Sequence, residues 1–470
     1  MKTITSRILT LTIFIGLLIP ALVQEGMFLD GITYAAISKN LAIGYGQFWE
    51  PHYTKTLYPS FSEHPPFVFI IESLFFKLFG NHFYTERIFT FFTALLTALG
   101  IIICWRELAK NNDIKENYWF PVLLWLLVPV VSWSYRNNML ENTMTVFTIY
   151  SVFFILKALK RNNIYLVPLS GLLIIFAFLS KGFVGLFPIV TPLLFGITFK
   201  VNKKAIVYFI VLILSMMISS VILIKLFPET IDNISRYLNQ QFLPAIKGQR
   251  EITTNNRFKI LLDLFIDLAV ILALLIPFLI DRIKNKRNKK FVVNKNFIFF
   301  LLVGICASIP LIISLKQRKF YLIPSIPFYA LSFGFLLNDF VMEKMKIVPE
   351  KYFKWFKKLL YSVLGLLLII SILKFGKYSR DMDNIRDVSL ISSLLDEGTI
   401  ISCATETWSN WGLVAYFIRI GYISLDCDNE HDYFLIKNGD ELPIKFRQVE
   451  LKGTKYTLLK KSTETNKLCK

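Results

Sequence analysis

Cysteine is scarce in this sequence, and it is not arranged for metal binding. The 470 residues include five cysteines. Cys104 and Cys306 fall within apolar runs, whereas Cys403, Cys427 and Cys469 fall in the polar C-terminal part. No spacing among them is typical of metal ligands. Cysteine therefore gives no indication of a metal centre.

Two further absences narrow the class of protein. No internal repeat is evident, and no low-complexity stretch occurs beyond the basic loop 282–295. Residues 1–23 have Lys2 and Arg7 before an apolar core, as a secretory signal does, but no convincing small-residue cleavage site precedes Asp30. We therefore expect a retained first helix.

What the sequence has in abundance is apolar runs of membrane-spanning length. Hydrophobic residues make up 54% of the chain, and 44 residues are Phe. A helix of about twenty apolar residues spans a bilayer, and few soluble domains have this composition. We predict a mainly α, polytopic transmembrane helical bundle of about eleven spans. The predicted spans are residues 8–23, 84–104, 119–134, 142–157, 164–180, 183–199, 205–226, 260–280, 296–314, 320–340 and 358–374.

The excess of Lys and Arg predicts the orientation of the spans. The formal charge is +20, and the basic residues cluster in short loops near 106–115, 157–161, 200–204, 282–295 and 344–358. Loops rich in Lys and Arg stay in the cytoplasm. Eleven spans with a cytoplasmic N-terminus put all of these basic loops on the cytoplasmic side. Residues 67–79 are also apolar, but they are short and interrupted by Glu72, Ser73 and Lys77, so we expect an interfacial helix there. The same clustering argues against nucleic acid as a partner.

The remaining loops then lie outside the cytoplasm, and they carry the unusual polar groups. These outer segments are 24–83, 135–141, 180–182, 227–259, 316–319 and everything after about 375. The first of them is rich in aromatic residues, which favour the headgroup layer of a bilayer. We therefore expect this loop to lie on the membrane. Its rings are Tyr34, Tyr45, Phe48, Trp49, Tyr53, Tyr58 and Phe61.

The predicted domain boundary falls near residue 375. Residues 1–374, with the loop 24–83, form the membrane domain, and 375–470 form a small α/β domain outside the cytoplasm. Residues 381–397 read as an amphipathic helix that ends at Gly398, and 399–405, 412–425, 433–437 and 454–460 read as strands.

Two acids on the outer face are candidates for chemistry. Asp30 follows an apolar helix, so partial desolvation would let it act as a base near neutral pH. Glu141 opens another helix on the same face, where it could also be a favourable N-terminal charge. Asp263 and Asp267 lie one turn apart near the outer end of a span, so they are either intramembrane functional groups or headgroup residues.

Several cations also lie on the outer face, although Lys and Arg are usually depleted there. The guanidinium group of Arg and the ammonium group of Lys both suit a phosphate ligand. Each could instead be a solvated anchor. They are His64, Lys181, Arg250, Arg257, Lys316, Arg318 and Lys319.

The order of these motifs resembles the GT-C membrane glycosyltransferases, most closely the ArnT-like branch of the protein-mannosyltransferase superfamily. The likeness covers about residues 1–340, and each motif is weak alone. The motifs are Asp30 after the first helix, Glu63-His64-Pro65-Pro66, Phe79-Gly80 before Glu86-Arg87, Tyr135-Arg136-Asn137-Asn138-Met139-Leu140-Glu141, Leu179-Ser180-Lys181-Gly182, and Arg318-Lys319-Phe320-Tyr321-Leu322-Ile323-Pro324.

The resemblance implies the GT-C fold, a bacterial inner-membrane location and transfer of a sugar from a polyprenyl-phosphate carrier at the periplasmic face. The acceptor would be lipid A, a protein or another glycan. By analogy Asp30 and Glu141 take the family's catalytic acidic positions. The residues expected to bind the donor phosphate are Glu63, His64, Lys181, Arg250, Lys316, Arg318 and Tyr321.

Three departures from the family pattern matter. Relatives often have a second acid after the first, where this chain has Gly31. Their Glu-Lys-Pro-Pro motif carries His64 here, which replaces a fixed positive charge with a titratable one. Metal-binding relatives use a His in the later outer loop, which here has Gln240-Gln241 and no His. We therefore expect no cofactor, although a divalent metal remains possible.

Two other classes of function are open at this point. A lipid or glycan transporter or flippase would keep polar groups near the bilayer midplane between repeated halves. A membrane anchor would only present the C-terminal domain to a partner, and Asp30 would then be dispensable.

Overall fold

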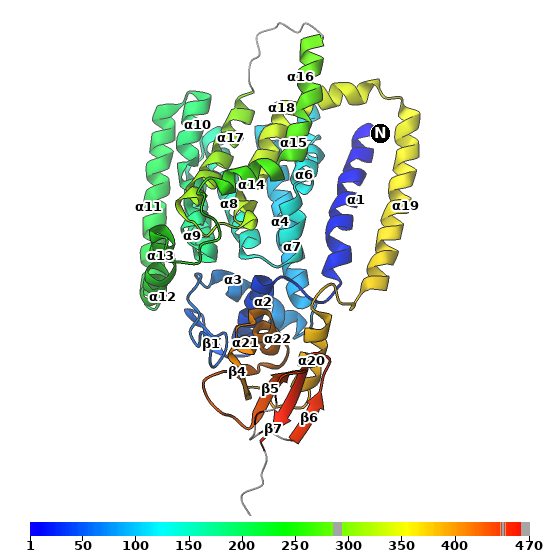
Figure 1. Cartoon of the computed structure of the whole chain (residues 1–470). Helices are drawn as coiled ribbons and strands as arrows, with labels where there is room; N and C mark the ends of the chain where they lie inside the picture. The colour runs from blue at the N-terminus through cyan, green and yellow to red at the C-terminus, as the bar shows by residue number, and fades with distance from the viewer. Residues whose placement is uncertain (285–293, 442, 444–445, 447, 462–470) are drawn as a thin grey trace, which may run out of the picture. The chain divides into compact units, whose positions relative to one another are not determined.

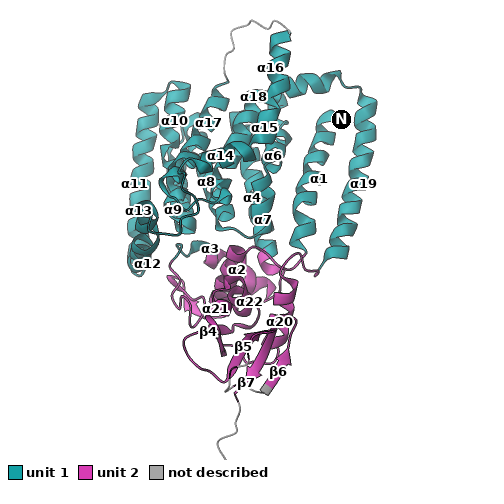
Figure 2. Cartoon of the chain, in the orientation of Figure 1, with its two compact units in different colours: residues 1–23, 63–68, 87–375 teal, residues 24–62, 69–86, 376–470 magenta. Residues whose placement is uncertain are grey.

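The computed structural model describes residues 1–284, 294–441, 443, 446 and 448–461, which form two compact units (Figure 2). Unit 1 comprises Met1–Val23, Glu63–Val68 and Arg87–Phe375, and unit 2 comprises Gln24–Ser62, Phe69–Glu86 and Gly376–Lys470. The basic residues at 286–290, predicted to be cytoplasmic, and Cys469 lie outside the described residues.

Unit 1 is a helical bundle (Figure 1). Its helices are α1 (Lys2–Leu22), α4 (Thr85–Leu108), α5 (Asn112–Lys115), α6 (Trp119–Leu126), α7 (Pro129–Arg136), α8 (Leu140–Arg161), η1 (Ile164–Leu166), α9 (Val167–Lys181), η2 (Phe183–Val190), α10 (Thr191–Phe199), α11 (Asn202–Leu226), α12 (Thr230–Tyr237), η3 (Leu238–Phe242), α13 (Leu243–Lys247), α14 (Lys259–Asp267), α15 (Ala269–Ala273), α16 (Leu275–Lys284), α17 (Lys295–Ser308), η4 (Ile309–Ile313), η5 (Lys319–Ser325), α18 (Ile326–Ile347) and α19 (Glu350–Lys374).

Eight helices among the described residues are long and apolar enough to cross a membrane, or ten if two bent pairs each count as one span. The bends are 80° between α6 and α7, where Pro129 begins the second helix, and 57° between α14 and the helices that follow. The predicted span 183–199 is a 3₁₀ segment joined to α10. Pro188 and Pro192 have no backbone N–H, so neither residue can donate a helical hydrogen bond. All eleven predicted positions are mainly helical, but only eight of these described segments are long and apolar enough to count as unbroken spans.

Polar side chains inside unit 1 bond to one another. The Tyr135 hydroxyl donates to Thr97 Oγ1 at 2.8 Å, and the Ser134 hydroxyl donates to Asn142 Oδ1 at 2.6 Å. Without such partners these groups would be costly between helices in lipid.

Unit 2 combines residues 24–62 and 69–86 with the C-terminal residues. Its elements are α2 (Leu29–Ala42), β1 (Gly46–Gln47), β2 (Glu50–Pro51), most of α3 (Phe67–Phe79), α20 (Met382–Ser392), β3 (Ile400–Cys403), α21 (Thr405–Trp408), α22 (Trp411–Gly421), β4 (Ser424–Asp426), β5 (Tyr433–Lys437), β6 (Gln448–Lys452) and β7 (Tyr456–Lys460). The larger sheet has the order β4-β3-β5-β7-β6, in which β3 is parallel to β4 and β5, and β7 is antiparallel to β5 and β6.

The first loop differs from the surface segment that its aromatic content indicated. Its first part is α2, which packs against α22, and Tyr34, Trp49, Tyr53 and Phe61 are at most 5% exposed. These four rings are therefore covered by other residues and do not form an exposed aromatic surface. Sequence composition could not distinguish the two because both environments favour aromatic residues.

The C-terminal elements were predicted in part. The strand 433–437 and the strand within 454–460 are confirmed, and β3 lies within 399–405. The strand predicted at 412–425 is wrong for most of its length, since Trp411–Gly421 is helix α22, with the Asn410 side chain accepting the Leu413 N–H at 3.2 Å. Only its end, Ser424 and Leu425, lies in a strand, β4. α22 is buried on almost every side, so it lacks the polar face that identifies a helix in a sequence.

Asp387 provides a test of unit 2. Its buried carboxylate accepts the backbone N–H groups of Thr454, Lys455 and Tyr456 at 2.7, 2.7 and 2.9 Å. We expect Asp387→Ala to lower the stability of the chain by about 1–3 kcal/mol per unsatisfied group, seen as a lower thermal unfolding midpoint in detergent. The matched control is Asp383→Ala on the same helix, whose exposed pair with Lys455 spans 3.7 Å. Equal shifts in the two variants would contradict this assignment.

Candidate functional site

Two antiparallel helices of unit 1 bring an acid and a cation together. Glu141 lies in the first turn of α8 and Lys181 is the last residue of α9, and the short connection between these helices returns the chain to the same end. Both charges are favourable where they stand, since helix N-termini attract acids and C-termini attract cations. Lys181 Nζ lies 2.6 Å from Glu141 Oε1, and the side chains are 7% and 1% exposed.

The turn after Lys181 requires glycine. Gly182 has φ +83°, and a Cβ at this position would lie 1.9 Å from the Tyr237 hydroxyl. The Gly182 N–H bonds to the Phe178 carbonyl at 2.5 Å and ends α9. The close approach lets Tyr237, from α12, cover the end of the helix that carries Lys181.

The segment η5 supplies an aromatic wall beside the same ammonium group. Lys181 Nζ is 5.1 Å from the centre of the Tyr321 ring and 5.6 Å from that of Phe320. Phe320 in turn stacks on Trp133, with ring centroids 5.5 Å apart. The surroundings of the Lys181 ammonium group are mostly apolar, so these ring contacts stabilise its charge in addition to the Glu141 carboxylate.

Glu63 and His64 enter the site from the residues before α3. Glu63 Oε1 accepts a hydrogen bond from Gln241 Nε2 at 3.3 Å, and Arg250 Nη2 lies 3.9 Å away. Gln241 lies in η3, a single π-helical turn, a feature that is frequent at functional sites.

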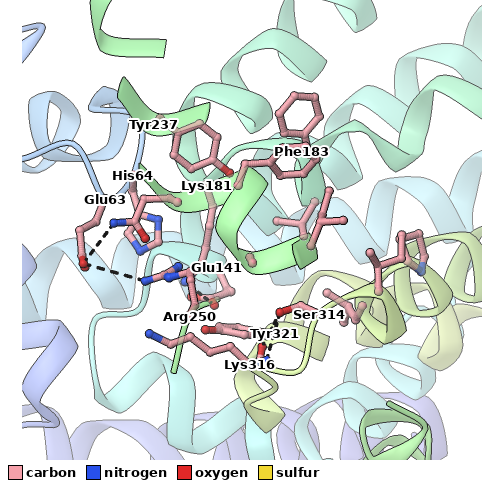
Figure 3. A pocket seen from close by; sticks show the side chains of 18 of the residues that line it. Glu63, His64, Glu141, Lys181, Phe183, Tyr237, Arg250, Ser314, Lys316 and Tyr321 are labelled. Atoms are coloured by element: carbon pink, nitrogen blue, oxygen red, sulfur yellow. Dashed lines mark hydrogen bonds and ion pairs between the residues drawn. The ribbon is translucent and has the colours of Figure 1, made fainter. Parts of the chain in front are cut away.

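These residues line one cavity of about 280 Å³, part of which Figure 3 shows. Charged and polar groups share its wall with a larger apolar surface. The apolar lining comes from Met144, Phe183, Val184, Phe242, Ala245, Ile246, Pro310, Leu311 and Ile313. The cavity can therefore hold a ligand that has an anionic end and a hydrocarbon part.

Each cation of the cavity has an acidic neighbour. Besides the Lys181 pair, Arg250 lies 3.9 Å from Glu63, and Lys316 Nζ lies 3.4 Å from Glu251. The cations are thus held in place without a ligand, yet only the first pair is short and deeply buried. An anion can compete for the two looser cations more readily than for Lys181.

His64 is a neutral residue in this setting. Burial lowers its pKa well below the ordinary 6.5, and Lys181, Arg250 and Lys316 lower it further. The titratable positive charge expected at this position from the sequence is therefore absent near neutral pH.

Seven of the nine predicted site residues line this cavity: Glu63, His64, Glu141, Lys181, Arg250, Lys316 and Tyr321. Arg318 is beside it, with Nη2 3.1 Å from Glu251 Oε1. Asp30 belongs to unit 2, where it occupies the first turn of α2 and is partly exposed.

The other candidates have different surroundings. Arg257 donates to the Ile313 carbonyl, and buried Asp263 pairs with Lys259 at 3.0 Å and with Lys319 at 3.9 Å. Asp267 is also buried, at 4% exposed.

Sequence reasoning missed several lining residues on the segment 230–250. Tyr237 and Phe242 belong to no recognisable motif, and Gln241 is distinguished in the sequence only by the absence of a His there. Gly182 marks a place where another chain segment approaches closely. Burial raises the pKa of Tyr237 to about 12. A hydrogen bond with the Phe183 backbone and the charge of Arg250 lower this pKa, but by less than burial raises it. Its hydroxyl therefore stays protonated.

Among the residues that the structure describes, no group of three or more His, Cys, Asp and Glu side chains is placed to hold a metal ion.

The family described as dolichyl-phosphate-mannose-protein mannosyltransferase matches residues 63–224, about a third of the chain. The structure of ArnT from Cupriavidus metallidurans bound to undecaprenyl phosphate superimposes with a TM-score of 0.62 at 14% identity, covering 97% of both chains. The same protein in the apo state gives 0.63 at 14% identity, covering 96% of this chain and 95% of that chain. No curated protein sequence matches.

These findings confirm the resemblance to the GT-C glycosyltransferases and the fold expected from it. They indicate a glycosyltransferase. The family match includes Glu63, His64, Glu141 and Lys181, whereas Arg250, Lys316 and Tyr321 lie beyond it.

The neutral state of His64 predicts a pH effect on stability. The unfolded histidine takes up a proton near pH 6.5 while the folded one stays neutral, so stability is full above that pH and falls below it, by up to about 1.4 kcal/mol per pH unit. We expect His64→Gln to lose less stability than the wild type between pH 7.5 and 5.5, measured as thermal unfolding in detergent. His82→Gln, at an exposed site, is the control. A loss as large as that of the wild type would contradict the assignment.

Proposed function

We propose that the chain transfers a sugar from a polyprenyl-phosphate carrier to an acceptor outside the cytoplasm. The observation that carries this proposal is the composition of the cavity, in which Lys181, Arg250 and Lys316 share one space with an extended apolar lining. A phosphate suits the cations and a prenyl chain suits the apolar wall. The ArnT structure that bound undecaprenyl phosphate has the same fold, which supports this class of ligand.

The position of the charged groups favours transfer over transport. Glu141 and Lys181 stand at the ends of their spans, and Arg250 and Lys316 lie in the segments between helices. A transporter keeps its binding groups near the bilayer midplane, often at broken helices.

The reaction is a single displacement at the anomeric carbon. An acceptor hydroxyl forms the new C–O bond, Asp30 removes its proton, and the bond to the carrier phosphate breaks with inversion. The departing phosphate keeps the electron pair and gains negative charge, which Lys181, Arg250, Lys316 and Arg318 stabilise. If the acceptor is itself a phosphate, Asp30 orients groups and stabilises positive charge on the sugar ring instead.

We assign Glu141 a supporting part in this reaction. Its carboxylate lies 2.6 Å from Lys181 Nζ, so it holds that ammonium group in place and fixes its charge. Tyr321 supports the same group through its ring face, and its hydroxyl can donate to the phosphate. Glu63 does the equivalent for Arg250.

The acceptor class that we propose is lipid A, a protein or another glycan in the bacterial cell envelope. The enzyme would lie in the inner membrane with a cytoplasmic N-terminus and unit 2 on the periplasmic side. The basic loops between spans support this orientation.

The proton-transfer step can be tested with matched acids. We expect Asp30→Asn to lower the transfer rate by about 100-fold or more, because general-base catalysis contributes about that factor. Wild-type and variant membranes would be offered a panel of polyprenyl-phosphate sugars, and labelled product counted. Asp383→Asn, at a partly exposed position of α20, is the control. Equal transfer by wild type and Asp30→Asn would overturn this mechanism.

The orientation can be tested by labelling. In a chain without its five native cysteines, Asn256→Cys and Lys203→Cys each place one thiol at an exposed position. A membrane-impermeant maleimide should modify residue 256 in spheroplasts and residue 203 only after the membrane is opened. The reverse result would place the cavity on the cytoplasmic side and remove the proposal.

A further inference from the structure

Two segments without regular helix or strand carry cations to the cavity. One runs from Gly248 to Phe258 between α13 and α14 and carries Arg250, and the other runs from Ser314 to Arg318 between η4 and η5 and carries Lys316. A cation on such a segment has no helix to fix its position, so its placement depends on what holds the segment.

Thr253 joins the two segments through its backbone and its hydroxyl. Its N–H donates to the Leu315 carbonyl at 3.2 Å, and its Oγ1 accepts the Gln317 N–H at 2.8 Å. The hydroxyl also lies 2.9 Å from the Gln317 carbonyl, to which it donates. The hydroxyl therefore receives one hydrogen bond and gives another to the same residue.

The Gln317 side chain uses both ends of its amide. Nε2 donates to the Arg257 and Ser314 carbonyls at 2.7 and 3.0 Å, and Oε1 accepts the Ile260 N–H at 2.9 Å. That N–H belongs to the first turn of α14, where no residue of the helix itself can accept it. Gln317 is 4% exposed, so these groups depend on each other and not on water for hydrogen bonds. Among neutral side chains of this size, only that of Gln has an amide, which supplies both a donor and an acceptor.

We propose that Thr253 and Gln317 form a latch that sets the separation of Arg250 and Lys316 and so the affinity of the cavity for its anion. They are positioning residues, because neither lines the cavity. Arg250 lies three residues before Thr253, and Lys316 directly precedes Gln317. Opening the latch lets both cations move apart while Lys181, on helix α9, keeps its place. This inference rests on the proposed function for the nature of the ligand.

The test measures binding of undecaprenyl monophosphate to the purified full chain, without any sugar transfer. We expect Thr253→Val, which keeps the shape and removes the hydroxyl, to weaken binding about 10-fold. Thr253→Ser, which keeps the hydroxyl, should bind the lipid phosphate about as tightly as the wild type. Thr254→Val is the matched control, since that neighbour bonds only within its own segment, to Asn256.

A mutant cycle separates the latch from general destabilisation. If Thr253 acts by placing Arg250 and Lys316, Thr253→Val should weaken binding little further once Arg250→Gln and Lys316→Gln are both present. Additive losses, or a Thr253→Val chain that binds like the wild type, would overturn the latch while Arg250→Gln still weakened binding. If neither Arg250→Gln nor Lys181→Met changed binding, the proposed lipid-phosphate site itself would fail.

Discussion

The candidate site depends on one buried ion pair. Lys181 and Glu141 are both more than nine-tenths buried, and removing either would leave an uncompensated charge at a cost of about 3–5 kcal/mol. Their helices bring them to the same end of unit 1, and every other charged group of the cavity is arranged around them. The pair holds one cation at a short distance, whereas Arg250 and Lys316 have more distant and more exposed acidic neighbours.

The sequence was sufficient to place helices at the predicted spans and to name seven residues that line the cavity. Runs of apolar residues identify helices in lipid without reference to packing, and Glu141 and Lys181 stand where such runs end. Tyr237 and Gln241 could not be predicted, because they reach the cavity through a turn of η3 and a close approach at Gly182. α22 was missed for a related reason, since its burial in unit 2 removes the polar face that marks a helix.

His64 shows how the surroundings of a residue decide its chemistry. The sequence places a titratable group where relatives have a fixed cation, and this substitution alone suggests a pH-dependent charge. Burial and three nearby cations oppose protonation, so the position contributes a neutral ring instead. The positive charge of the cavity then comes from residues on other segments, which makes their placement decisive.

Unit 2 is assembled from residues 24–62 and 69–86 and from the last fifth of the chain. The Lys39 ammonium of α2 donates to the carbonyls of Ile418 and Arg419 at 3.2 Å, across 379 and 380 positions of sequence. A ribosome adding about 5–20 residues per second needs roughly 20–80 s to cover that interval. Throughout that time α2 can contact only residues of its own part of the chain, such as Glu72, and not α22. An incomplete translation product can therefore insert its spans but cannot complete this unit. Membrane proteases that recognise unfolded segments would therefore distinguish finished from unfinished copies.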